Sequence, residues 1–144
     1  MKFSWFLFSV SSTVAIIVSS VYFAGVFPGR HRDYLNLEDI NLHVMNSVLV
    51  MLEFAIAAYP LRLLHVVYVW LYCLAYVIFS AIYWAFDHSH VMYPGVLDWN
   101  APAITAVVLV VLTIVGIPLL QFILFSLFQL RMFIYTRVYE QSLE

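Results

Sequence analysis

The stretch LLHVVYVWLYCLAYVIFSAIYWAF, from Leu63 to Phe86, runs without a single Asp, Glu, Lys or Arg. A helix needs about 20 mostly apolar residues to cross the hydrocarbon core of a bilayer, which is about 30 Å thick. This stretch is long enough to do so. Its predicted structure is therefore a transmembrane helix.

Three further runs have the same character. Residues 3–27 and 101–130 carry no charge, and residues 40–59 carry only Glu53. Pro118 predicts a kink in the last run, because proline removes a helical hydrogen bond. Membrane barrels would instead show alternating segments of about 10 residues. The sequence predicts an all-α, polytopic transmembrane helix bundle with four spans, forming a single domain over residues 1–144.

The overall composition agrees with this fold class. Of the 144 residues, 65% are hydrophobic and 10% are charged, whereas a soluble domain has charge on about a quarter of its positions. The net charge of −2 argues against a nucleic-acid partner, which would require a basic face. No phosphate-binding glycine loop is present, and we expect no cofactor.

The first run also has the features of a secretory signal peptide, with Lys2 as its basic start. Its apolar stretch is longer than the roughly 7 to 15 residues of a signal sequence. We therefore expect an uncleaved span, and a cleaved signal peptide is the alternative.

The basic residues predict how the spans are oriented, because short cytoplasmic segments are enriched in Lys and Arg. With four spans, one side of the membrane would hold Lys2, Arg62, Arg131 and Arg137, and the other Arg30 and Arg32. We therefore expect a multipass protein of the plasma membrane or an endomembrane, with both termini in the cytoplasm.

Polar residues interrupt the second run at helical spacing. At 100° per residue, four of them fall within about 80° of one another on a helical wheel: Asp39, His43, Asn46 and Glu53. An acidic residue near the bilayer centre costs at least about 2.5 kcal/mol on insertion scales. We expect this polar stripe to face protein or a water-filled cavity.

The third run carries a matching stripe of polar rings, formed by His65, Tyr68, Tyr72 and Tyr76. The turn at Pro60 is short, which predicts that spans two and three pack as an antiparallel hairpin. We therefore expect the two stripes to face each other, with a pocket between them in one interpretation.

Two interpretations compete for the residues of the second span. Glu53 is either a hydrogen-bonded carboxyl that holds two helices together or a proton- or ligand-handling group. His43 is either a hydrogen-bonded interfacial histidine or a base at the mouth of a pocket. If the protein is an enzyme, the candidate catalytic residues are His43, Asn46 and Ser47.

Two other segments invite a functional interpretation. The loop DHSH, residues 87–90, is too short to define a metal site, because zinc normally takes three or four protein ligands, and we expect no metal. In the first span, Ser12, Ala15 and Ser19 share one side. Small residues let helix backbones approach closely, so we interpret this face as a packing surface.

The chain resembles the rolling stone family of multipass membrane proteins. The resemblance rests on three blocks in order: NLHVMNSVLVMLEF, YPLRLLHVVYVWLYCLAYVIFSAIYW and YPGVLDWNAP. It implies an integral membrane protein that is associated in insects with myoblast fusion. We therefore expect a non-enzymatic protein that acts through the lipid bilayer, a lipid ligand, a membrane-protein partner or a homo-oligomer, with recognition carried by residues 87–100.

The order of these blocks is also distantly similar to the androgen-induced membrane hydrolases, which cleave fatty acid esters of hydroxy fatty acids. That resemblance places the catalytic histidine of the hydrolases at Asn46 and leaves Thr13 without a matching role. The alternative function is an intramembrane lipid-ester hydrolase or a lipid-binding protein, with its pocket between spans two and three.

Overall fold

The computed structural model describes residues 2–29, 36–57, 59–89, 91 and 93–141. Four helices in this part of the chain are long and apolar enough to cross a membrane. They are Ser4–Val26, Leu37–Ile56, Leu63–Phe86 and Pro102–Glu140. The predicted fold class, an all-α bundle with four spans, is confirmed.

Each span is built from several helical segments. The first is α1 (Lys2–Val21) followed by η1 (Tyr22–Val26) and η2 (Phe27–Gly29); the second is α2 (Leu37–Asp39), η3 (Ile40–Met45) and α3 (Asn46–Ile56). The third is η4 (Leu63–His65) and α4 (Val66–Phe86), and the fourth is α5 (Pro102–Val111), η5 (Leu112–Gly116) and α6 (Ile117–Gln141). Three of these segments, η1, η3 and η5, are π-helical.

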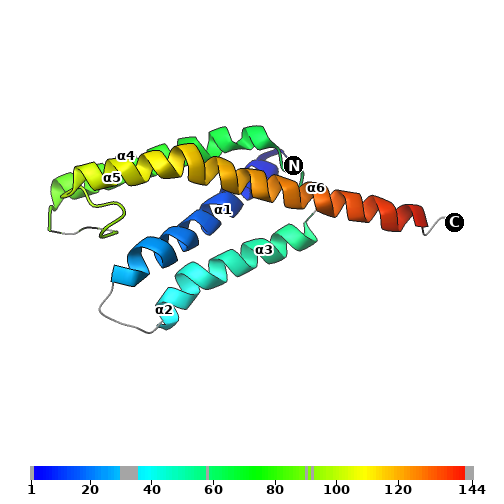
Figure 1. Ribbon diagram of the computed structural model, residues 1–144, viewed down its shortest axis with the longest axis horizontal. Coiled ribbons are helices and arrows are strands. Elements are labelled where there is room, and N and C mark those ends of the chain that lie inside the picture. The colour runs from blue at the N-terminus through cyan, green and yellow to red at the C-terminus, as the bar shows by residue number, and fades with distance from the viewer. Residues whose placement is uncertain (1, 30–35, 58, 90, 92, 142–144) are drawn as a thin grey trace.

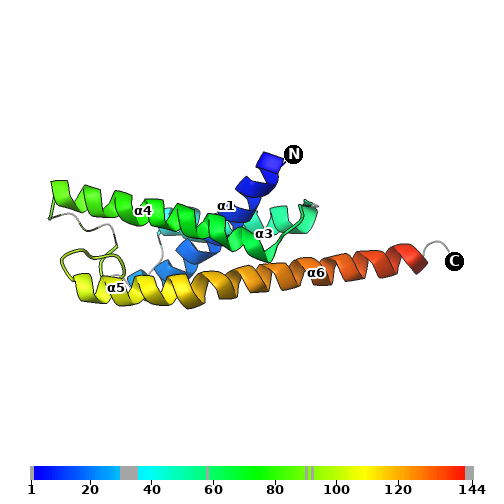
Figure 2. The same cartoon turned by 90° about the horizontal axis from the view of Figure 1, so that it is seen from above.

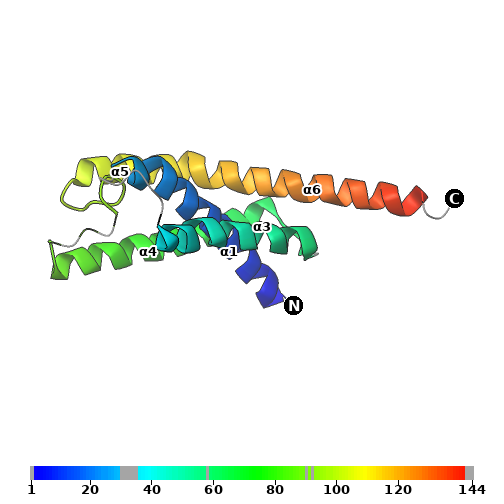
Figure 3. The same cartoon turned by 90° about the horizontal axis from the view of Figure 1, so that it is seen from below.

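The fourth span is much longer than the membrane requires. At about 1.5 Å per residue, α5, η5 and α6 together extend about 60 Å, twice the thickness of the hydrocarbon core. Figure 3 shows α6 running beyond the ends of α3 and α4. The π-helical segment η5 lies directly before Pro118, where the proline ring would crowd the carbonyl of the preceding turn.

The first span is the central element of the bundle. The α1 helix contacts α3, α4 and α6, and Figure 1 shows it crossing between α3 and α4. Ser12 and Ala15 are buried, as expected for the small-residue face. At the end of the bundle near the N-terminus, the core consists of Phe8, Phe54, Leu61 and Leu124.

This arrangement corrects the predicted hairpin of spans two and three. Both α3 and α4 pack mainly against α1, so the two predicted stripes do not form one interface. The short connection at Pro60 brings the ends of the two helices together, but α1 occupies the space between their bodies (Figure 1).

Polar side chains of α6 hold the connection between α3 and α4. Arg131 donates hydrogen bonds to the carbonyls of Phe54 and Ala57 over 2.7 and 2.6 Å. Gln121 is buried; it accepts a bond from Thr13 Oγ1 at 2.9 Å and donates to the Arg62 carbonyl at 3.0 Å. Gln121 thus joins α6 to α1 and to the segment that leads into the third span.

Candidate functional site

Half of the predicted polar stripe forms a buried cluster against the first span. Asp39 and His43 are both buried, and both meet Tyr22 of η1. The Tyr22 hydroxyl donates a hydrogen bond to Asp39 Oδ1. The His43 ring stacks on the Tyr22 ring with a centroid separation of 3.6 Å and an interplanar angle of 8°.

The same carboxyl group also fixes the start of the second span. The Asp39 N–H donates to Asn36 Oδ1 over 2.7 Å, and the Asn36 N–H donates to Asp39 Oδ2 over 3.3 Å. This is a capping box, in which two backbone N–H groups at a helix start are satisfied reciprocally. Asp39 therefore connects the cap of α2 to Tyr22.

Two serines extend the cluster one helical turn deeper. Ser19 Oγ lies 2.6 Å from Ser47 Oγ and also donates to the His43 carbonyl. Ser47 Oγ is 3.3 Å from the Ala15 carbonyl. Interhelical hydrogen bonds of this kind each contribute about 0.6 to 2 kcal/mol in membranes, so these contacts stabilise the packing of α1 against the second span.

The remaining residues of the two predicted stripes lie elsewhere. Asn46 and Glu53 point out of the bundle and are exposed. His65 Nδ1 lies 3.1 Å from Ser9 Oγ of α1. The stripe, which was expected to face protein or a water-filled cavity, is therefore divided. Asp39 and His43 face protein, whereas Asn46 and Glu53 lie on the outer surface of the bundle.

The tyrosines of the third span are also divided. Tyr68 packs edge-on against Phe6 with a centroid separation of 5.0 Å, and Tyr72 is exposed. Tyr72 and Tyr76 both line a cavity beside α4. The predicted tyrosine stripe is therefore divided between Phe6 and this cavity.

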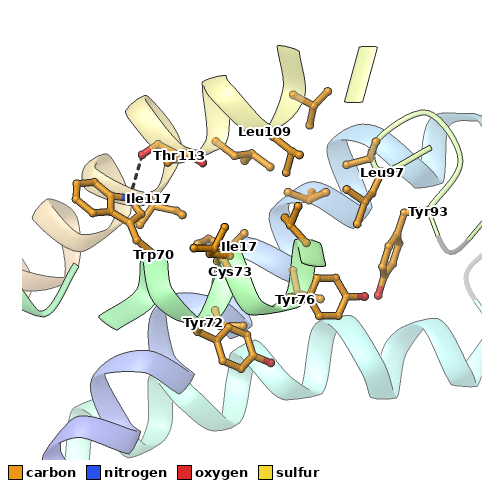
Figure 4. Close-up of a pocket in the computed structure, with 18 of the residues that line it drawn as sticks. Ile17, Trp70, Tyr72, Cys73, Tyr76, Tyr93, Leu97, Leu109, Thr113 and Ile117 are labelled. Atoms are coloured by element: carbon orange, nitrogen blue, oxygen red, sulfur yellow. Dashed lines mark hydrogen bonds between the residues drawn. The ribbon is translucent and has the colours of Figure 1, made fainter. Parts of the chain in front are cut away.

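That cavity lies between α1, α4 and the first half of the fourth span (Figure 4). Its volume is about 790 Å³, toward the upper end of the range of about 300–1,000 Å³ for ligand sites. Figure 2 shows α4 and α5 spread apart at the end where residues 87–101 join them. The cavity lining is almost entirely apolar and includes Ile17, Cys73, Leu97, Val108 and Leu109.

A few polar groups mark the two ends of the cavity. The Tyr76 and Tyr93 hydroxyls point toward each other at one end (Figure 4). At the other end the Trp70 indole donates to the Thr113 carbonyl over 3.1 Å. Thr113 belongs to η5, whose π-helical turn displaces backbone groups from the regular α-helical pattern.

The polar cluster and the cavity are neighbours, because Tyr22 belongs to both. Tyr22 lines the cavity, and its ring also stacks on the His43 ring. No residue of α2, η3 or α3 lines the cavity. This cavity thus lies among spans one, three and four, and not at the predicted position between spans two and three.

The segment between α4 and α5 closes one end of the cavity. Residues 93–97 form a tight turn with an isolated bridge between Tyr93 and Leu97, in which Gly95 has a φ of +79°. Only glycine adopts this conformation readily. Val96 and Leu97 are buried and line the cavity, so the turn points its apolar side chains into the bundle.

Hydrogen bonds at both ends hold this segment in place. The Trp99 indole donates to Ser80 of α4 over 3.1 Å, and the Trp84 indole donates to Asn100 over 3.0 Å. Thr105 Oγ1 accepts from the Asp98 N–H and donates to the Asp98 carbonyl. Among the described residues no group of His, Cys, Asp and Glu could hold a metal, and His90 of the DHSH loop lies outside them.

Several of these residues were not singled out from the sequence. Tyr22 and Gln121 are the main examples, and each is an uncharged polar side chain within a predicted span. Their lack of charge made them inconspicuous. A polar group without charge inside a predicted span is nevertheless a signal, because it must find a partner when it is buried.

Comparison with known proteins identifies a family. A family model described as "Protein rolling stone" matches residues 1–142. "Protein rolling stone" of Drosophila melanogaster is 34% identical over 142 residues, which is 91% of this chain and 49% of that protein. The chain thus spans about half the length of this relative. No solved structure matches.

Proposed function

The chain belongs to the rolling stone family of membrane proteins, and on this premise we propose that it is non-enzymatic and binds the hydrocarbon chain of a lipid between α1, α4 and α5. The observation that carries the proposal is the cavity of about 790 Å³ with its apolar lining. An elongated apolar ligand suits such a site.

The polar groups at the ends of the cavity support a lipid over a purely apolar ligand. A bilayer already solvates a hydrocarbon chain, so moving that chain into an apolar cavity brings little gain. Selectivity must then come from the few polar groups that fix its orientation. The Tyr76 and Tyr93 hydroxyls are suited to hydrogen-bond the ester or headgroup oxygens of a lipid.

The position of His43 favours binding over ester hydrolysis. A general base must come within hydrogen-bond reach of the proton it removes, directly or through one water. His43 does not line the cavity, and its ring is stacked on Tyr22, which does line it. Asn46 and Ser47 also lie on the second span, away from the cavity lining.

We further propose that the protein acts in cell adhesion or myoblast fusion, the setting that the family resemblance implies. Both termini would lie in the cytoplasm of a plasma-membrane protein, which places residues 87–100 outside the cell. Pro94, Gly95 and Asn100 are exposed in this segment, while Val96 and Leu97 anchor it in the cavity. A recognition surface would thus be coupled to the lipid site.

A substitution that fills the cavity tests the lipid proposal. Val108→Trp places a large ring at a cavity-lining position of α5. We expect this variant to retain at most about a tenth of the lipid that the wild-type protein carries through purification, a difference of about 1.4 kcal/mol or more in binding. Native mass spectrometry of the detergent-purified protein measures the bound lipid.

The neighbouring Val107→Trp variant is the matched control. Val107 is on the same helix but 64% exposed, so its ring would face the surrounding lipid and bound lipid should match the wild type. Equal lipid retention in the two variants would show that the cavity is not the binding site.

A further inference from the structure

The second span presents an outward face whose use the lipid site does not explain. Val50 and Phe54 of α3 are buried against the bundle. On another side of the helix, Asn46, Leu49, Glu53 and Ile56 are exposed. At 100° per residue these four lie within about 80° of one another, and we call them the α3 stripe.

The spacing of the α3 stripe is that of a coiled-coil seam. Its members are separated by three, four and three residues, the alternation of a and d positions in a heptad repeat. All four members belong to the regular helix α3. Asn46 and Glu53 are seven residues apart and both occupy a positions, whereas Leu49 and Ile56 occupy d positions.

Asn46 is the residue that lipid would tolerate least. It lies in the middle of the span Leu37–Ile56, at the depth of the hydrocarbon core. Its side chain makes no hydrogen bond to any described residue. An amide that is buried in an apolar medium without a hydrogen bond costs several kcal/mol, so we expect a polar partner from outside the described residues to meet it.

We propose that the α3 stripe packs against the same stripe of a second copy of this chain. Two copies inserted in the same membrane have the same orientation, so their α3 helices run parallel. In a parallel pair of helices, each a position faces the a position of its partner. Asn46 then faces Asn46 of the second copy, and Glu53 faces Glu53.

Both polar pairs are chemically self-complementary. A carboxamide carries donors and acceptors, so two facing Asn46 side chains satisfy each other. Two facing Glu53 carboxyls form a hydrogen bond when one of them holds a proton, since a protonated carboxyl donates. A single asparagine at an a position is a known determinant of register and of two-stranded pairing, which favours a second copy over an unrelated helix.

Cysteine cross-linking tests this dimer in the full chain in lipid vesicles. Cys73 is the one cysteine of the sequence, and its replacement in Cys73→Ala gives a silent background. We expect Leu49→Cys in that background to form a disulfide-linked dimer on mild oxidation. Met51→Cys is the control, because Met51 is also exposed but lies on the other side of the helix, about 160° from Leu49.

A second variant tests the role of the amide itself. We expect Asn46→Leu to weaken dimerisation about tenfold, measured by single-molecule photobleaching over a dilution series in vesicles. Asn41→Leu removes an exposed amide outside the stripe and should leave dimerisation unchanged. Equal cross-linking at the two cysteine positions, a monomeric wild-type protein, or tighter association of Asn46→Leu would each overturn the proposal.

Discussion

Replacing Gln121 by Leu is expected to destabilise the protein by about 2 kcal/mol, because two hydrogen bonds are lost. The Gln121 amide is buried and joins Thr13 of α1 to the Arg62 carbonyl. A leucine of similar size fills the space but removes both hydrogen bonds, each of which contributes about 1 kcal/mol. The Arg62 carbonyl keeps the His65 N–H as its other donor, at 3.1 Å. Thr13 retains its bond to the Ser9 carbonyl, which limits the loss.

The midpoint of thermal unfolding measures this effect. For a chain of this size each kcal/mol shifts the midpoint by about 2–4 °C, so a decrease of roughly 4–8 °C is expected in detergent. The control is Gln129→Leu, which removes the same group from an exposed position two turns further along α6. A similar decrease in both variants would mean that the Gln121 bridge contributes nothing specific.

Replacing Gly25 by Val is expected to displace the turn at residues 93–97. A Cβ atom at Gly25 would lie 2.6 Å from Val96 Cγ2, closer than non-bonded carbons approach. Overpacking of this kind costs about 1–3 kcal/mol. Because Val96 lines the cavity, its displacement opens the cavity at that end.

The thiol of Cys73 measures this opening, because it lines the same cavity. In Gly25→Val we expect a water-soluble maleimide to label Cys73 at least about fivefold faster, as a cost of 1 kcal/mol or more implies. The matched control is Ala24→Val, because Ala24 is exposed one residue earlier. Under the adhesion proposal, Gly25→Val should also reduce cell fusion at equal surface delivery. An unchanged labelling rate would contradict the closing role of Val96.

The number and position of the spans could be predicted from the sequence because they depend on length and charge alone. Residues 63–86 are the clearest case, since the predicted run and the observed span coincide. The fourth span was predicted to end at residue 130, but the helix continues to Gln141. The last turns of α6 carry charged and polar side chains, so the hydropathy of the sequence places them outside the membrane. Their backbone is nevertheless helical.

The directions in which the polar side chains of the second span point could not be predicted, for two physical reasons. A helical wheel assumes a rotation of 100° per residue. The segment η3 is π-helical over residues 40–45, and each residue of a π-helix rotates by less than 100° because a turn contains more residues. This separates Asp39 and His43, which face Tyr22, from Asn46 and Glu53, which face outward. Nothing local in the sequence signals such a turn.

The second reason is the choice of neighbours. Chain order suggested that spans two and three pack together, but α1 brings its own polar groups to both of them. Ser19 meets Ser47, and Ser9 meets His65. The first span was interpreted only as a small-residue packing face, so the cluster around Tyr22 and the cavity beside it were missed.

The central claim is that a hydrocarbon chain occupies the cavity. Photo-cross-linking from the acyl chain of a lipid tests this claim most directly. A phospholipid that carries a diazirine in its acyl chain would be reconstituted with the full protein and irradiated. Mass spectrometry would then identify the labelled residues. Lipid-binding in the cavity predicts labels that saturate with lipid concentration at Cys73 and Val108, and labels that do not saturate at exposed Val107 and Val110. Labelling confined to exposed positions, with none at Cys73 or Val108, would contradict it.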